Sequence, residues 1–121
     1  MGQYIDIILK LIVSLSILNV WLIRANKPSE YRGGSASTIK EEFAAYGLSE
    51  TMMKLVGFVK CILAVLLLVS IAYQPLEIFA VAGICATMLG AIVMHFKIND
   101  EPKKSMPAAV FFILTLFTLF V

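Results

Sequence analysis

Three polar side chains interrupt apolar stretches of the sequence, and they are the first candidates for chemistry. They are Asn19, Lys60 and His95. A charged side chain in such a segment costs about 2.5–3.5 kcal/mol on insertion scales, so it marks a candidate functional site. Amide, ammonium and imidazole groups donate hydrogen bonds, and together they suit binding of a small molecule that carries acceptor oxygens.

Catalytic and metal chemistry find little support in the remaining reactive residues. Cys61 and Cys85 both lie in apolar runs and no CxxC pair occurs, so we interpret them as packing groups and not as redox thiols. His95 is the one histidine, and no Cys or His stands at metal-ligand spacing from it. The sequence therefore identifies no candidate catalytic residue and no candidate metal ligand. It favours a protein that is not an enzyme.

The composition defines the elements that must position these groups. Hydrophobic residues make up 60% of the 121 residues and charged residues 15%, and the mean hydropathy is +0.93. A soluble domain needs a more polar surface, so soluble enzymes, nucleic-acid binders and disordered chains are excluded. Four apolar runs each approach the roughly 20 residues that a bilayer core requires. We predict a single integral membrane domain over 1–121, an all-α four-helix transmembrane bundle with spans at about 5–24, 50–73, 77–97 and 104–121.

The polar segment between the first two spans contains a further helix. Thr38 and Glu41 fit a capping box, and Ile39, Phe43 and Tyr46 follow at helical spacing. We predict a short amphipathic helix over about 38–46 that lies on the membrane surface or on the mouth of the bundle. In the same way, we expect Ser105 to cap the last helix, with Pro107 in its first turn.

Packing between the second and third spans is predicted from a short turn and from small residues. Pro75 marks a tight hairpin, so these two helices should be antiparallel neighbours. Small residues let helix backbones approach closely in a membrane. We expect the two small-residue faces to meet, namely Gly57, Cys61 and Ala64 on one helix and Ala82, Ala86 and Gly90 on the other.

Basic residues predict the orientation. Seven of them lie in the loops on one side of the spans: Arg24, Lys27, Arg32 and Lys40 in the first loop and Lys97, Lys103 and Lys104 in the third. The other side has only Lys10. The positive-inside rule then places the first and third loops in the cytoplasm and both termini outside.

Alternating helix directions bring Asn19, Lys60 and His95 to one depth, close to the side that carries the basic loops. We expect the nearest counter-charges to be Glu41 and Glu42 on the amphipathic helix. We therefore hypothesise a polar pocket that this helix covers. The candidate ligand-binding residues are Lys60, His95, Asn19, Glu41, Glu42 and Arg32. The alternative is structural: Lys60 pairs with a glutamate and only ties the helix to the bundle.

Six short segments carry a resemblance to a known family. They are Asn19–Leu22, Lys27–Gly34, Lys40–Leu48, Gly57–Lys60, Met88–Ala91 and Met94–Lys97. In this order they resemble the DoxX-like family of small four-span bacterial membrane proteins. The resemblance implies a bacterial inner-membrane location. It also implies roles such as quinone-coupled sulfur oxidation or membrane complexes for oxidative stress, with distant animal relatives in receptor assembly. It transfers no catalytic residue.

Three functions remain open from the sequence. The first is an accessory or redox-associated inner-membrane protein that binds a quinone or a lipid in the polar layer. The second is a small multidrug-type transporter, which needs a membrane-embedded acid that the middle of these spans lacks. The third is a structural subunit of a membrane complex, with another membrane protein or a second copy as its partner.

Overall fold

The computed structural model describes residues 2–24, 26–27 and 31–121, and every regular element within these ranges is helical. Pro28, Ser29 and Glu30 of one family-like segment lie outside the described residues. The elements are α1 (Gly2–Leu18), η1 (Asn19–Ile23), α2 (Ile39–Ala45), α3 (Glu50–Val69), η2 (Gln74–Leu76), α4 (Glu77–Lys97), α5 (Pro102–Phe117) and η3 (Thr118–Phe120).

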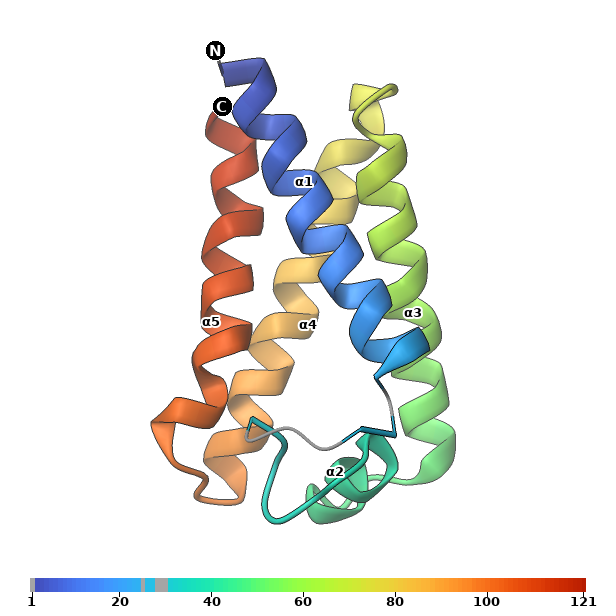
Figure 1. The fold of residues 1–121 in the computed structure, drawn as a ribbon, viewed down its shortest axis with the longest axis vertical. Helices are drawn as coiled ribbons and strands as arrows, with labels where there is room; N and C mark the ends of the chain where they lie inside the picture. The colour runs from blue at the N-terminus through green and yellow to red at the C-terminus, as the bar shows by residue number, and fades with distance from the viewer. Residues whose placement is uncertain (1, 25, 28–30) are drawn as a thin grey trace.

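Four continuous helical stretches are long and apolar enough to cross a bilayer, which confirms the predicted fold class. They are Gln3–Ile23, Glu50–Val69, Gln74–Lys97 and Pro102–Phe120. Figure 1 shows both termini at one end of the bundle, beside the turn between α3 and α4. The short helix α2 lies across the opposite end, near the turn between α4 and α5.

The interior of the bundle is a narrow apolar core. Its buried members are Val13, Ile17, Ala64, Leu67, Ala80, Val81, Ile84 and Met88. Large apolar side chains such as Phe58, Phe79 and Ile113 are exposed on the outer faces. An outer surface of this kind is unfavourable in water and suits contact with lipid chains.

Local signals fix the ends of α2. Thr38 Oγ1 accepts a hydrogen bond from the backbone N–H of Glu41 at 3.1 Å, as the capping prediction requires. At the other end Gly47 has a φ of 81°, which glycine adopts without strain, and the N–H of Leu48 bonds to the carbonyl of Phe43. Ile39, Phe43 and Tyr46 are all buried, so the apolar stripe packs on the mouth of the bundle.

The prediction that the two small-residue faces meet was wrong. Ala82, Ala86 and Gly90 are exposed, because α4 turns Ala80, Val81, Ile84 and Met88 toward the core. The close approach between α3 and α4 instead occurs at Gly83, where an added Cβ would collide with the side chain of Leu63.

The start of the last span also differs from its prediction. Helix α5 begins at Pro102 and follows Glu101, so Ser105 does not cap it and Pro107 lies inside it. Pro102 occupies the first turn, where a missing N–H costs nothing. This earlier proline therefore takes the role expected for Pro107.

Candidate functional site

A cavity of about 400 Å³ lies beneath α2, between that helix and the adjacent parts of η1, α3 and α4. We call it the main cavity. Its walls are largely apolar, with Arg32, Glu42, Tyr46, Thr87 and Lys60 as the polar exceptions. The remaining lining residues are Val20, Trp21, Ile39, Phe43, Leu48, Met52, Val56, Gly90, Ala91 and Met94.

A smaller cavity of about 210 Å³ extends toward α5 and is called the side cavity. His95, Lys104 and Phe111 contribute to its lining. Six residues line both cavities: Val20, Trp21, Arg32, Glu42, Lys60 and Ala91. The two spaces are thus two parts of one site that share these residues.

Trp21 is placed by η1, a π-helical turn at the end of the first span. Such turns are rare and often occur at functional sites. The indole packs over Gly57, where an added Cβ would come within 2.6 Å of the ring. Its edge contacts Phe43 of α2 at a centroid distance of 5.9 Å, and the Nζ of Lys60 lies 5.5 Å from the ring centroid. Trp21 therefore joins α1, α2 and α3 at the cavity wall, with a cation–π contact to Lys60.

Arg32 connects the first loop to α2. It is buried, and its Nη1 donates to Glu42 at 3.2 Å. Its Nη2 donates to the carbonyl of Arg24 at 2.7 Å and to that of Lys27 at 3.2 Å. The guanidinium of Arg32 thus ties the backbone at Arg24 and Lys27 to Glu42 of α2.

Glu42 also accepts from Tyr46, at 2.6 Å between Oε1 and the phenol oxygen. Burial, followed by the charge and the hydrogen bond of Glu42, raises the pKa of Tyr46 above its ordinary value. The phenol is therefore neutral throughout the physiological range. An added Cβ on Gly33 would lie 2.6 Å from the ring of Tyr46, so the absence of a side chain at Gly33 makes room for this ring.

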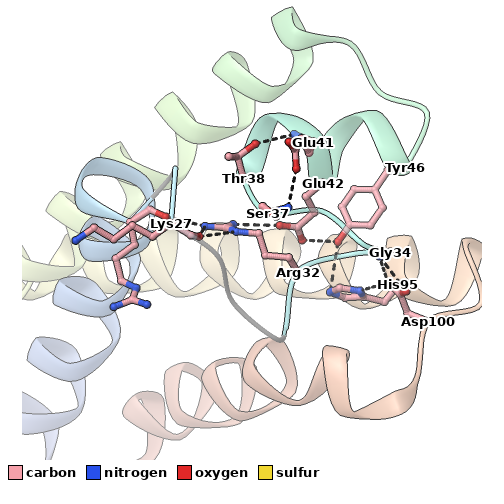
Figure 2. Close-up of polar contacts among 11 residues, drawn as sticks. Lys27, Arg32, Gly34, Ser37, Thr38, Glu41, Glu42, Tyr46, His95 and Asp100 are labelled. Carbon is pink, nitrogen blue, oxygen red and sulfur yellow. Dashed lines mark hydrogen bonds and ion pairs between the residues drawn. The ribbon is translucent and has the colours of Figure 1, made fainter.

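The chain of contacts continues from Tyr46 to His95 and Asp100, as Figure 2 shows. The phenol oxygen lies 3.4 Å from His95 Nε2, and His95 Nδ1 lies 2.7 Å from Asp100 Oδ2. The chain places Asp100 beside His95 because Asn99, with a φ of 57°, forms a left-handed turn after α4. The N–H of Asp100 then bonds to the carbonyl of His95.

Asp100 also ties the loop to the start of α5. The N–H of Gly34 donates to its two oxygens at 3.0 and 3.3 Å, and the Nζ of Lys104 lies 3.9 Å from Oδ1. Burial alone raises the pKa of Asp100, but the hydrogen bonds from His95 and Gly34 and the charge of Lys104 outweigh it. The pKa of Asp100 is thus held below its usual range, and the carboxylate stays ionised.

The structure brings four of the six sequence-predicted site residues together. Lys60, Arg32 and Glu42 line both cavities, and His95 lines the side cavity with them. Asn19 is exposed at the start of η1 and lines neither cavity. Glu41 is exposed as well and accepts from the N–H of Ser37 at 2.7 Å, which is a role in capping α2.

Sequence reasoning missed three members of the site. Tyr46 was assigned only to the apolar stripe, although a phenol carries a hydrogen-bonding end. Asp100 follows His95 by five residues, and the left-handed turn that joins them has only one weak sequence signal, an Asn-Asp pair after a long helix. Trp21 could have been anticipated only from the π-helical turn, which has no simple sequence signature.

A second buried polar cluster was also missed, at the end of the bundle that carries the termini. Lys10 Nζ lies 2.9 Å from Asp6 Oδ2 and 3.3 Å from Glu77 Oε1, and its side chain is only 2% exposed. The sequence signal is the i, i+4 spacing of Asp6 and Lys10, with Glu77 opening another helix at the same end. Across the described ranges, no group of three or more His, Cys, Asp or Glu side chains is arranged to hold a metal ion.

These features define a four-span integral membrane protein with a half-open apolar cavity and a buried polar network at one end. The chain matches the model of the DoxX-like family over residues 34–118, and it belongs to that family. No curated protein and no solved structure matches it.

Proposed function

We propose that the main cavity binds a small amphiphile of the quinone class, and that the protein serves as an accessory or redox-associated component of the bacterial inner membrane. The basic loops support an orientation with α2 on the cytoplasmic side and both termini outside. In this orientation a lipid-soluble molecule would reach the cavity from the cytoplasmic leaflet.

The single observation that carries this proposal is the ammonium of Lys60. It lines an otherwise apolar cavity and rests against the ring of Trp21. Within the described residues it has no hydrogen-bond acceptor, whereas every guanidinium nitrogen of Arg32 already donates a hydrogen bond. An ammonium without an acceptor in an apolar space is suited to bind a ligand oxygen.

The size and walls of the cavity fit a quinone ring. Ligand sites commonly measure about 300–1,000 Å³ and combine apolar walls with a few directed polar groups. Trp21, Phe43 and Tyr46 provide flat aromatic surfaces, and Lys60 provides the donor. When bound, a quinone would supply redox chemistry that the side chains of this chain lack.

Transport of a cation finds less support than binding. A multidrug-type mechanism needs an embedded acid that is free to exchange a proton for a substrate. At the end of the bundle that carries the termini, Asp6 and Glu77 are both paired with Lys10. They lie at the opposite end of the bundle from the cavity, so they are separated from the proposed ligand.

Trp21 permits a direct binding test, because it is the one tryptophan in the chain. Titration of the purified protein in nanodiscs with decyl-benzoquinone is expected to give saturable quenching of its fluorescence. Lys60→Met should weaken binding about 10- to 100-fold, because a hydrogen bond to a charged group contributes about 1.5–3 kcal/mol.

Lys54→Met is the matched control, since Lys54 lies on the same helix but its side chain is 72% exposed. This variant should bind decyl-benzoquinone like the native chain. Quenching that rises linearly without saturation, or an unchanged Kd in Lys60→Met, would refute the proposed site and leave a structural role for Lys60.

A further inference from the structure

A separate groove of about 470 Å³ lies on the outer surface of the bundle, between η1, α2 and the first part of α3. We call it the outer groove. Figure 1 shows α2 beside this end of α3. Trp21 and Ile39 line both the outer groove and the main cavity. These two side chains therefore form a wall between two distinct spaces, and the outer groove can take a ligand of its own.

The outer groove has a polar rim and an apolar floor. The polar residues are Asn26, Lys40, Glu50 and Lys54, and the apolar ones include Leu22, Phe58 and Cys61. Cys61 follows Lys54 by seven positions on α3, which is about 10 Å along a helix. Because α3 is one of the four candidate membrane spans, the groove extends from the level of the lipid headgroups to the level of the acyl chains.

The rim carries an uncompensated positive charge. The Nζ atoms of Lys40 and Lys54 each lie 3.8 Å from an oxygen of Glu50, which is longer than a hydrogen bond. Two ammonium groups thus share one carboxylate, and their side chains are 68% and 72% exposed. An ammonium has three hydrogens to donate, so both lysines can bind a further acceptor oxygen that carries negative charge.

We propose that the outer groove binds one anionic phospholipid from the surrounding leaflet, with its phosphate between Lys40 and Lys54 and its acyl chains on the apolar floor. Charge complementarity selects this occupant, because the positive rim meets the headgroup and the apolar floor meets the chains. A soluble anion would use the rim alone. An apolar helix from a second copy would leave the two ammonium groups without a counter-charge. This site is independent of the ligand proposed for the main cavity.

Native mass spectrometry of the detergent-solubilised protein gives the Kd of the first retained lipid. The chain is titrated with phosphatidylglycerol and with phosphatidylcholine that carries the same acyl chains. Phosphatidylglycerol should bind about 5- to 25-fold more tightly, the factor expected when one or two lysines lie beside an anionic headgroup. sn-Glycerol 3-phosphate, which has the phosphate without the chains, should not displace the bound lipid at equal concentration.

Two variants of the rim should change this Kd in opposite directions. Lys40→Met removes one ammonium group and should weaken phosphatidylglycerol binding about fivefold. Glu50→Gln removes the carboxylate that repels the phosphate, so it should tighten binding, and damage to the fold would not produce such a gain. Lys103→Met and Glu101→Gln are the matched controls, since both positions are exposed and lie outside the groove. Both should bind the lipid like the native chain.

Several results would overturn the proposed lipid site. Equal Kd values for the two lipids would remove the headgroup selection. A loss in Lys103→Met as large as that in Lys40→Met would assign the effect to the basic surface as a whole. Unchanged or weaker binding in Glu50→Gln would contradict the assigned rim, and displacement by sn-glycerol 3-phosphate would contradict the role of the floor. A lipid-free dimer that is lost in Phe58→Ala would assign the groove to a second copy instead.

Discussion

Replacing Lys10 with methionine is expected to lower the free energy of unfolding by about 3–5 kcal/mol, the cost typical of breaking a buried ion pair. Lys10 holds Asp6 at 2.9 Å and Glu77 at 3.3 Å in a site from which solvent is largely excluded. Without the ammonium, two carboxylates of α1 and α4 face each other. The second oxygen of Asp6 is already buried without a hydrogen-bond partner, so no neighbouring donor can compensate.

The measurement is reversible unfolding in mixed micelles, followed by the fluorescence of Trp21. Lys54→Met is again the control, because Lys54 pairs with Glu50 at 3.8 Å on an exposed surface and such pairs contribute less than about 1 kcal/mol. Adding Glu77→Gln to Lys10→Met should recover part of the loss. Equal losses in Lys10→Met and Lys54→Met would contradict the assigned role of the cluster.

Asp100→Asn is expected to weaken the attachment of the first loop to the rest of the bundle, at a cost of about 2–3 kcal/mol. Asp100 accepts from His95 at 2.7 Å and from the N–H of Gly34, and it lies beside Lys104. One side chain thus joins the first loop, α4 and α5. The loss is local, so hydrogen exchange of the amides in residues 31–46 should show it, with faster exchange in the variant.

The same carboxylate predicts a pH dependence. The pKa of Asp100 is held below its usual range in the folded protein, so its contribution to stability is complete at neutral pH. This contribution is lost as the pH falls below the ordinary aspartate value of about 3.9 and through the folded pKa. Asp100→Asn should lack this acid-dependent step. Glu101→Gln, at the exposed neighbouring position, should retain it, and an acid-dependent step of native size in Asp100→Asn would contradict the assignment.

The fold was largely predictable because hydropathy and helix-capping signals act locally. The four spans follow from apolar run length, and α2 follows from Thr38, Gly47 and the stripe of Ile39, Phe43 and Tyr46. The small-residue faces were mispredicted because several arrangements of four helices satisfy one short hairpin. The choice among them depends on where larger residues such as Ile84 and Met88 pack.

The candidate site was predictable only in part, since depth follows from the sequence whereas lateral position does not. Counting residues places Lys60 and His95 near the same end of the bundle, and both line the side cavity. The same count places Asn19 there, yet the turn at η1 brings Trp21 and not Asn19 to the cavity. The position of Asp100 beside His95 depends on the left-handed backbone of Asn99, which a single sequence does not specify.

We propose that a quinone-class molecule occupies the cavity beneath α2, and photolabelling with an aryl-azide benzoquinone tests this claim. Mass spectrometry of the labelled protein should locate adducts on lining residues such as Phe43, Met52 and Val56. Unlabelled decyl-benzoquinone should suppress these adducts, and Lys60→Met should reduce them. Labelling confined to the outer faces, at residues such as Phe58 and Phe79, without suppression by the competitor, would contradict the claim.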